Sequence, residues 1–376
     1  MNFEFSEDQK FIKETAQNFL ADKCDSTEVR RILDGDESYH TELWAAVAEM
    51  GWMGTAIPEE YDGLGLGYLE LCVIAEELGR AVAPIPFSST VYLFAEAIMA
   101  AGSEEQKKKY LPKIAAGELI GALAMSEGAG AVTPKSISTS VSGGKLTGTK
   151  VPVVDGDVAD FAVVAANTGP GNDEGSISLF VVDLKGDGVT VETVSTVDPT
   201  RGHASITLNG AVGEPLGETG EGWNIIDRVF DRAAVLIAFE QMGGSQAALD
   251  MAKAYAMDRY AFGRSIASFQ AIKHKLADMY VATELARSNC YYGAWALSTD
   301  APELAVAAAT ARVSASEAYA FTSKENIQTH GGMGFTWEFD CHLHYRRSKI
   351  LGLTIGSLPR WKDRLIDRLE ASNVAA

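Results

Sequence analysis

The sequence predicts a mainly α-helical protein with a central antiparallel β-domain. Two observations lead to this fold class: residue composition changes near positions 118 and 220, and the spacing of apolar residues changes with it. Helical spacing dominates both ends of the 376-residue chain, whereas the middle is rich in glycine and β-branched residues. We therefore expect a helical domain over 1–118, a β-domain over 119–220 and a helical bundle over 221–376.

Five helices are predicted in the first segment. Ser103 followed by Glu104 and Gln106 is a helix-start signature, because such side chains can cap the first backbone N–H groups of a helix. A glycine-punctuated loop is expected over 58–67. The predicted helices are Asp8–Leu20, Thr41–Met50, Leu69–Ala81, Ser88–Ala101 and Glu104–Ala116.

Short strands separated by turns are predicted in the middle segment. Residues 119–220 hold 17 of the 36 glycines, and turn clusters such as 168–173 separate runs rich in Val, Ser and Thr. The predicted strands are Ser136–Val141, Phe161–Ala166, Ile177–Val182, Val189–Val194 and Ser205–Leu208.

Long amphipathic stretches rich in alanine follow in the last segment, which contains two prolines, Pro302 and Pro359. Long periodic helices joined by short polar breaks predict a helical bundle. The predicted helices are 224–258, 265–298, 301–328 and 340–371.

Charge excludes some classes of partner. Residues 1–220 contain 15 basic and 34 acidic side chains, which accounts for the whole net charge of −19, and residues 221–376 contain 17 of each. Binding of nucleic acid or of an anionic membrane surface needs a basic face, so neither is expected. The neutral segment can still place Arg and Lys side chains against an anionic ligand.

A cytoplasmic location is expected. Met1–Lys10 is polar and acidic and does not have the pattern of a signal peptide, and no apolar run reaches the roughly 18 residues that a membrane span needs. The four cysteines (Cys24, Cys72, Cys290 and Cys341) lie far apart, which fits a reducing compartment.

Widely shared catalytic motifs are absent: there is no dinucleotide-binding G-x-G-x-x-G after a strand, no Walker loop, no G-x-S-x-G and no H-E-x-x-H. His342 and His344 are two residues apart and would point to different faces of a helix. We therefore predict no metal site.

Two stretches carry specific chemistry. In Asp258–Ile266, an arginine at a helix end stands beside Phe-Gly, which offers an anion clamp and an aromatic wall. In Gln328–Phe335, a Gly-Gly-x-Gly run allows backbone to approach a flat or phosphorylated ligand. Taken singly, the first could be a helix end with a surface arginine, and the second a tight turn between helices.

Together these stretches resemble the acyl-CoA dehydrogenase family of flavoproteins, and the resemblance covers the whole chain. Ile57–Gly65, Glu76–Arg80 and Ser103–Glu118 are also typical of this family. The family fold consists of an N-terminal helical domain, a β-barrel-like middle domain and a C-terminal four-helix bundle, in the order of the three segments above.

The resemblance implies an acyl-CoA substrate, FAD as cofactor, and an electron-transferring flavoprotein as the electron acceptor. In family members the flavin lies at a subunit interface, and the bundle of one chain clamps the pyrophosphate and adenosine of its neighbour's FAD. By that likeness the FAD of the adjacent subunit would be held by Arg259, Phe262, Gln328, Gly331 and Gly332.

The catalytic glutamate of the family is missing from both of its usual positions. The family's reaction removes a proton α to the thioester and needs a general base. By alignment with the family motifs, the two positions are occupied by Ile355 and Ala233, neither of which can accept a proton. Asp231 and Glu240 are nearby acids, but their spacing places them poorly as substitutes. The catalytic residue is therefore unknown.

The β-domain also departs from the family pattern. Ser126–Val132 has Ala and Val where the family has a polar Ser-Asp pair. In Lys150–Gly156, Pro152 replaces a tryptophan that lines the flavin ring, and Val154 replaces a threonine at its N5 edge.

Three functions remain open on these grounds. The chain could be the base-lacking subunit of a heteromeric acyl-CoA dehydrogenase, completing a homologous partner's FAD site. It could be a self-sufficient homo-oligomer that uses an unusual base or catalyses an elimination. It could also be a helical scaffold or acyl-CoA binder without flavin chemistry. In the enzymatic readings, Ala81–Phe87 either borders the acyl pocket or is an ordinary connector.

Overall fold

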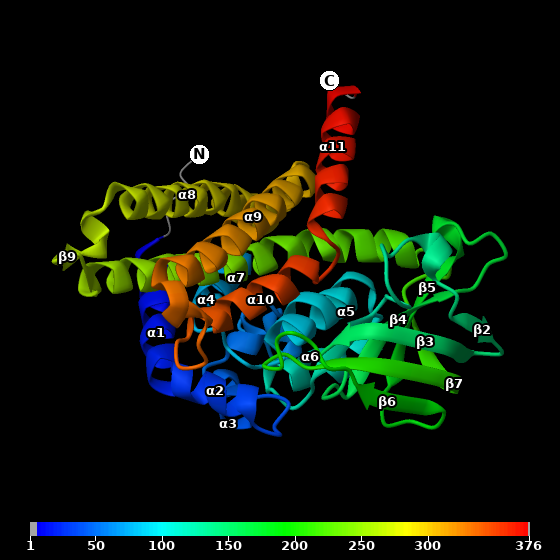
Figure 1. Ribbon diagram of the computed structural model, residues 1–376. Helices are drawn as coiled ribbons and strands as arrows, with labels where there is room; N and C mark the ends of the chain where they lie inside the picture. Colours follow the sequence, from blue (N-terminus) through cyan, green and yellow to red (C-terminus); the bar gives the residue numbers. More distant parts are fainter. Residues whose placement is uncertain (1–5, 375–376) are drawn as a thin grey trace. The chain divides into compact units, whose positions relative to one another are not determined.

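The computed structural model describes residues 6–374 (Figure 1). The predicted polar start of the chain therefore lies partly outside the described residues. Contacts divide the chain into two units. The first unit comprises Met1–Arg30, Tyr68–Ala83 and Ala234–Ala376, and the second comprises Arg31–Gly67 and Pro84–Ala233. The division into three domains, which was based on composition, stays a prediction.

The first unit is helical. Its helices are α1 (Glu7–Lys23), the start of α2 (Ser26–Asp34), α4 (Tyr68–Arg80), most of α7 (Gly222–Asp258), α8 (Gln270–Ser298), α9 (Leu304–His330), α10 (Cys341–Leu353) and α11 (Leu358–Val374). Helix α9 packs against α8, α10 and α11. Ser245 of α7 also places its Oγ 2.9 Å from Oγ1 of Thr283 in α8 and 3.0 Å from Oγ1 of Thr322 in α9. These fully buried hydroxyls join three helices of the bundle at one level.

Helices α4 and α7 approach so closely that glycine is required between them. A Cβ on Gly79 would lie 1.8 Å from the backbone oxygen of Glu240, and one on Gly243 would lie 1.8 Å from that of Glu76. Any larger side chain at either position would push the two helices apart.

The second unit contains the β-domain together with shorter helices. Its strands are β1 (Gly121–Ala124), β2 (Ser140–Ser142), β3 (Lys145–Val154), β4 (Phe161–Asn167), β5 (Ile177–Asp183), β6 (Val189–Thr193) and β7 (His203–Leu216). The strand order is β1-β4-β2-β3-β7-β5, and β5 also pairs with β4, so the sheet closes on itself like a barrel. Most pairs are antiparallel, but β1 and β2 each pair with β4 in parallel.

Helices of this unit are α3 (Thr41–Glu49), α5 (Glu96–Ala101) and α6 (Glu104–Ala115). Helix α6 begins at the predicted capping box, in which Ser103 and Gln106 cap each other's backbone N–H groups. It is tied to strand β7, because Gln106 Nε2 donates to the backbone oxygen of Pro215 at 2.9 Å.

The structure corrects several predicted strands. The predicted strand Ser136–Val141 begins only at Ser140, because Pro134–Ser136 is a short 3₁₀ turn. Strands β1 and β3 were not predicted. Proline normally argues against a strand, and β3 accommodates Pro152 at an irregularity between Lys150 and Val153. Strand β7 extends well beyond the predicted Ser205–Leu208.

Helix boundaries also differ from prediction. The predicted helix 340–371 is two helices, because Ile355 and Gly356 both have positive φ between them. The first part of the predicted helix Ser88–Ala101 is π-helical over Ser88–Ala95. Helix α2 was not predicted, and the predicted helix 265–298 begins only at Gln270.

Among the described residues, no helix combines the length and the apolar character that crossing a membrane demands.

Candidate functional site

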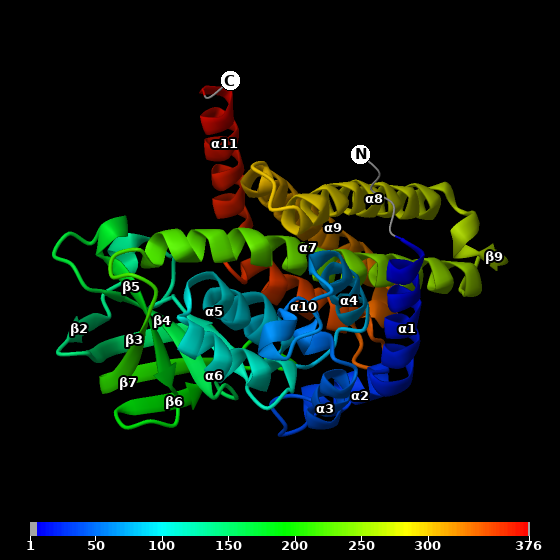
Figure 2. The ribbon, with the colours of Figure 1, turned by 180° about the vertical axis from the view of Figure 1, so that it is seen from behind.

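A two-stranded hairpin follows the end of α7 (Figures 1 and 2). Its strands are β8 (Tyr260–Ala261) and β9 (Arg264–Ser265). The two turn residues, Phe262 and Gly263, have φ values of 54° and 79°, as a tight hairpin turn requires. Such a φ is rare and strained for an aromatic residue, and the Phe262 side chain is 96% exposed. The hairpin thus presents at its tip an exposed phenyl ring, which has an edge contact with Phe269 at 6.2 Å between ring centroids.

Arg259 stands at the base of this hairpin. Its backbone N–H donates to the Tyr255 oxygen at 2.8 Å, and its own oxygen accepts from Ile266 N–H at 2.8 Å, so its backbone is held on both sides. Its side chain is exposed and makes no hydrogen bond or ion pair with any described residue. By contrast, the Arg264 guanidinium lies 4.0 Å from the centre of the Phe269 ring. Arg259 is therefore the hairpin arginine available to an external anion.

The glycine-rich turn follows the end of α9. Gly331 has a φ of 61°, and a Cβ at Gly331 or Gly332 would meet nothing within 4 Å. A Cβ on Gly334 would instead lie 2.4 Å from the backbone oxygen of Ile327, so that glycine serves the chain's own packing. Gly332 is required by neither a positive φ nor internal packing, and Gln328 beside the turn is exposed. The turn therefore offers open backbone to a molecule approaching from outside.

The structure brings the two predicted motifs to one end of the bundle. The rings of Tyr255, on the last turn of α7, and His330, the last residue of α9, stack with centroids 4.0 Å apart and planes inclined by 26°. Lys275 Nζ of α8 lies 2.8 Å from Glu325 Oε2 of α9 nearby. The five residues predicted to hold FAD lie on the chain segments that this contact joins.

These residues fit a flat ligand that carries a diphosphate. Arg259 supplies a cation with five donor groups, and the bare backbone at Gly331 and Gly332 allows close approach without a clash. The exposed ring of Phe262 offers a flat apolar face. All of these groups face away from the chain's own core, so the ligand would be covered by another molecule.

At the first of the two catalytic positions, Ile355 lies in a strained turn between α10 and α11. Its φ is 58°, which is a genuine outlier for a β-branched side chain. The turn is anchored on both sides: Arg312 donates to the backbone oxygens of Leu351 and Thr354, the latter at 2.8 Å, and Trp361 Nε1 donates to the oxygen of Ile355 at 3.2 Å.

Arg312 was not singled out from the sequence. It is buried on α9, and its Nη1 donates to Gln241 Oε1 at 2.6 Å. Burial lowers the pKa of Arg312 to about 9, although the nearby Glu240 carboxylate acts in the opposite direction. A single arginine among alanines on a helix carries no sequence signal of such a role, because its partners are backbone oxygens distant in the sequence.

The second catalytic position, Ala233, is fully buried on α7, and Asp231 two residues earlier is buried as well. Glu240, also buried, has its Oε1 3.7 Å from Arg347 Nη1. Arg347 also donates to the backbone oxygens of Ala83 and Val82, at 3.2 and 3.3 Å. Glu240 therefore neutralises a buried arginine that holds the turn after α4, which is a structural role.

The β-domain keeps one buried ion pair at the modified loop. Glu127 accepts from Lys150 Nζ at 2.7 Å and from both the N–H and the hydroxyl of Ser138 and Thr139. Burial acts against ionisation, but these donors together lower the pKa of Glu127 to about 2. The loop after it ends in exposed Ala131 and partly buried Val132, neither of which offers a polar side chain.

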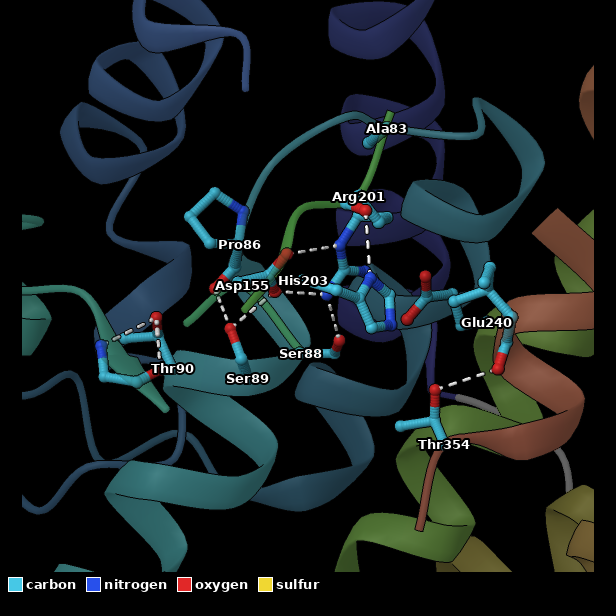
Figure 3. A network of polar contacts seen from close by, with 12 residues as sticks. Ala83, Pro86, Ser88, Ser89, Thr90, Asp155, Arg201, His203, Glu240 and Thr354 are labelled. Carbon is cyan, nitrogen blue, oxygen red and sulfur yellow. Dashed lines mark hydrogen bonds and ion pairs between the residues drawn. The ribbon is translucent and has the colours of Figure 1, made fainter. Parts of the chain in front are cut away.

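A second buried network follows β3, and the sequence did not reveal it (Figure 3). Asp155 lies between Arg201 and Ser89: Arg201 donates Nε to Oδ1 at 3.1 Å and Nη2 to Oδ2 at 2.5 Å, and Ser89 Oγ donates to Oδ2 at 2.6 Å. Arg201 Nη2 also donates to Ser88 Oγ at 2.8 Å. The network fixes the backbone just after Val154, a position predicted to face a flavin ring.

His203 belongs to the same network and pairs with Val154 across β3 and β7. Its Nδ1 lies 3.2 Å from the Arg201 oxygen, so Nδ1 carries a proton and donates it. Burial, more than its neighbouring charges, lowers the pKa of His203, which favours the neutral ring. His203 is therefore a buried, neutral imidazole beside the altered position 154.

Comparison with known proteins places these features in context. A family model described as the N-terminal domain of acyl-CoA dehydrogenase matches residues 6–118, and one described as its C-terminal domain matches residues 220–358. The chain is 32% identical over 343 residues to the acyl-CoA dehydrogenase IpdE2 of Mycobacterium tuberculosis, with 91% of each chain covered.

Two solved structures are similar over almost their whole length. Butyryl-CoA dehydrogenase from Megasphaera elsdenii is 27% identical with a TM-score of 0.92, covering 98% of this chain and all of the other. A variant of the Tcur3481-Tcur3483 steroid ACAD is 29% identical with a TM-score of 0.88, covering 98% of this chain and 99% of the other.

Proposed function

Because the chain belongs to the acyl-CoA dehydrogenase family, we propose that it is the base-lacking subunit of a heteromeric enzyme and completes the FAD site of a homologous partner. The family consists of FAD-dependent oxidoreductases that act on the CH–CH bond of acyl-CoA thioesters. FAD, when bound, supplies a two-electron acceptor for this desaturation.

The observation that carries the proposal is a contrast within one chain. The groups suited to a neighbour's FAD are present and face outward: the Arg259 side chain makes no hydrogen bond or ion pair with the described residues, and Phe262 is 96% exposed. The two positions predicted to carry a catalytic base hold Ile355 and Ala233, and Val154 stands where the family resemblance predicts a threonine at the flavin edge. A role as a scaffold alone would not require the exposed residues Arg259 and Phe262 that suit a neighbour's FAD.

Each retained residue has a distinct task in this proposal. Arg259 binds the diphosphate through charge-assisted hydrogen bonds, and the backbone of Gly331 and Gly332 lets that group approach closely. Phe262 lies against a flat ring, and Gln328 offers an amide for hydrogen bonding. The partner subunit supplies the base that removes the α-proton.

The acyl group is proposed from the relatives. Among them are IpdE2 and the Tcur3481-Tcur3483 protein, which is described as a steroid ACAD. We propose a bulky, ring-containing acyl-CoA as the substrate of the complex, in a pathway of lipid or steroid breakdown. An electron-transferring flavoprotein remains the predicted electron acceptor.

The test compares flavin content in the chain alone and in the chain co-expressed with a homologous partner. We expect little or no flavin absorbance from the isolated chain and one FAD per two chains in the complex. Arg259→Glu should remove FAD from the complex, because it places a carboxylate against the diphosphate. Lys253→Glu, a charge reversal at an exposed position of the same helix, is the control.

Full flavin occupancy in the isolated chain would overturn this proposal. It would favour a second function, a self-sufficient flavoenzyme with an unusual base, for which His203 is the specific observation. If the complex instead keeps its FAD after Arg259→Glu, this chain takes no part in FAD binding, and the result would favour a role for it as a scaffold or acyl-CoA binder.

A further inference from the structure

An aromatic cluster joins the end of α7, which leads into the hairpin, to the end of α9, which leads into the glycine-rich turn. Tyr255 and His330 stack at 4.0 Å, and Phe339 closes the cluster edge-on, with its centroid 6.0 Å from Tyr255 and 5.7 Å from His330. These three rings come from the end of α7, the end of α9 and the segment before α10.

Each side of the stack is connected through the backbone to one part of the proposed FAD clamp, the set formed by Arg259, Phe262, Gln328, Gly331 and Gly332. The Tyr255 backbone oxygen accepts from Arg259 N–H at 2.8 Å, one helical turn away. His330 directly precedes Gly331, and its Nδ1 donates to the Asn326 oxygen at 2.9 Å, which fixes the ring on the helix. His330 is buried, with 5% of its surface exposed.

The side chains of the clamp do not themselves hold Arg259 at a fixed distance from the glycine-rich turn. Gly331 and Gly332 have no side chains, and the side chains of Arg259 and Gln328 make no contact through hydrogen bonds or ion pairs with other described residues. His330 is the last side chain before the glycines. The spacing between Arg259 and the glycine turn therefore depends on the helix ends, which the Tyr255–His330 stack joins.

We infer that Tyr255 and His330 are positioning residues that set the distance between Arg259 and the glycine-rich turn to match a diphosphate. This inference rests on the proposed function, because the diphosphate is that of the partner's FAD. A displacement of about 1 Å between two binding groups can weaken their joint action strongly, so loss of the stack should reduce FAD affinity without removing a contacting group.

The experiment measures FAD affinity of the co-expressed complex, by flavin fluorescence, for Tyr255→Ala and Tyr255→Phe. The interaction free energy of an aromatic pair of this kind is large enough to change a binding constant by up to about tenfold. We expect Tyr255→Ala to weaken FAD binding by about tenfold and Tyr255→Phe, which keeps the ring, to bind like the unmodified complex. Tyr39→Ala, which removes an edge contact with Trp44 in the second unit, is the control and should not change affinity.

All affinities are measured at a temperature at which circular dichroism shows every variant folded. If Tyr255→Ala does not fold, His330→Ala removes the same stack from the other side. Unchanged affinity in the alanine variant, or equal losses in Tyr255→Phe and Tyr255→Ala, would overturn the inference. Failure of the proposed function can be told apart from failure of this inference, because it would appear as unchanged FAD binding in the Arg259→Glu complex.

Discussion

At the scale of single residues, burial decides what each arginine does. Arg201 is buried against the carboxylate of Asp155, Arg312 is buried against backbone oxygens, and Arg347 holds the turn after α4. Breaking any of these would leave an uncompensated buried group. Arg259 alone of this group is exposed and without a partner among the described residues, so it is the one that can serve an external anion.

His344 makes the folded state sensitive to acid. It is buried beside Tyr319, whose hydroxyl lies 3.2 Å from its Nδ1. Burial, and then the charge of Arg347, lower the pKa of His344 to about 4. The unfolded chain takes up this proton near pH 6.5, so the stabilisation is present above that pH and is lost as the pH falls towards about 4.

We therefore expect the free energy of unfolding to fall between pH 6.5 and 4, with a contribution from His344 on the order of 3 kcal/mol. Urea denaturation at a series of pH values, in the protein and in His344→Gln, measures this contribution as the difference between the two profiles. His274→Gln, at an exposed position of α8, should follow the unmodified profile. Parallel profiles for the protein and His344→Gln would contradict the prediction.

At the scale of elements, the turn between α10 and α11 is strained. The two helices were predicted as one because their apolar spacing is continuous. The left-handed conformation of Ile355 breaks them, and the buried Arg312 holds that conformation through two backbone oxygens. Ile355 occupies one of the two positions predicted for a catalytic glutamate. Strained backbone is commonly found at active sites.

Ile355→Gly should stabilise the chain by about 1 kcal/mol, because glycine adopts positive φ without the clash that a β-branched residue suffers. Equilibrium unfolding in urea checks this value. Asp363→Gly, at an exposed position inside α11, should destabilise by a similar amount, since glycine is a poor helix former. A destabilising effect of Ile355→Gly would show that side-chain packing outweighs the backbone strain.

At the scale of the whole molecule, the positions that depart from the family pattern lie in both units. Ile355 belongs to the first unit, while Ala233 and the two β3 residues Pro152 and Val154 belong to the second. The acidic excess lies in residues 1–220, and the segment that contains the clamp is neutral. The loss of the base is therefore one of several changes rather than an isolated substitution.

Restoring a carboxylate should not restore activity by itself. We expect the isolated Ile355→Glu chain to remain free of flavin and inactive, because Val154 and Pro152 still lack the groups predicted to line the flavin ring. Flavin absorbance and a dye-reduction assay with acyl-CoA esters measure both properties. Turnover in this variant would show that the missing base was the sole defect and would favour the self-sufficient enzyme.

The fold class was predictable from the sequence because it depends on local patterns, and the residues of the proposed clamp, which stay a prediction, were named from local motifs. Apolar spacing identified the long helices, and the Arg259 and Gly331 motifs are contiguous in the chain. Strand β3 escaped prediction, since Pro152 argues against a strand unless an irregularity accommodates it.

By itself, the sequence determined the order of helical and β segments, the family and the absence of a glutamate at positions 355 and 233, and it named the five residues of the proposed clamp. Only the tertiary structure decided which arginines are buried, that Ile355 is strained, that Asp155 pairs with Arg201, and that Tyr255 stacks on His330. The physical reason is distance along the chain. Arg312 and Thr354, or Tyr255 and His330, meet only when helices pack, and no local pattern records which side chains will then face one another.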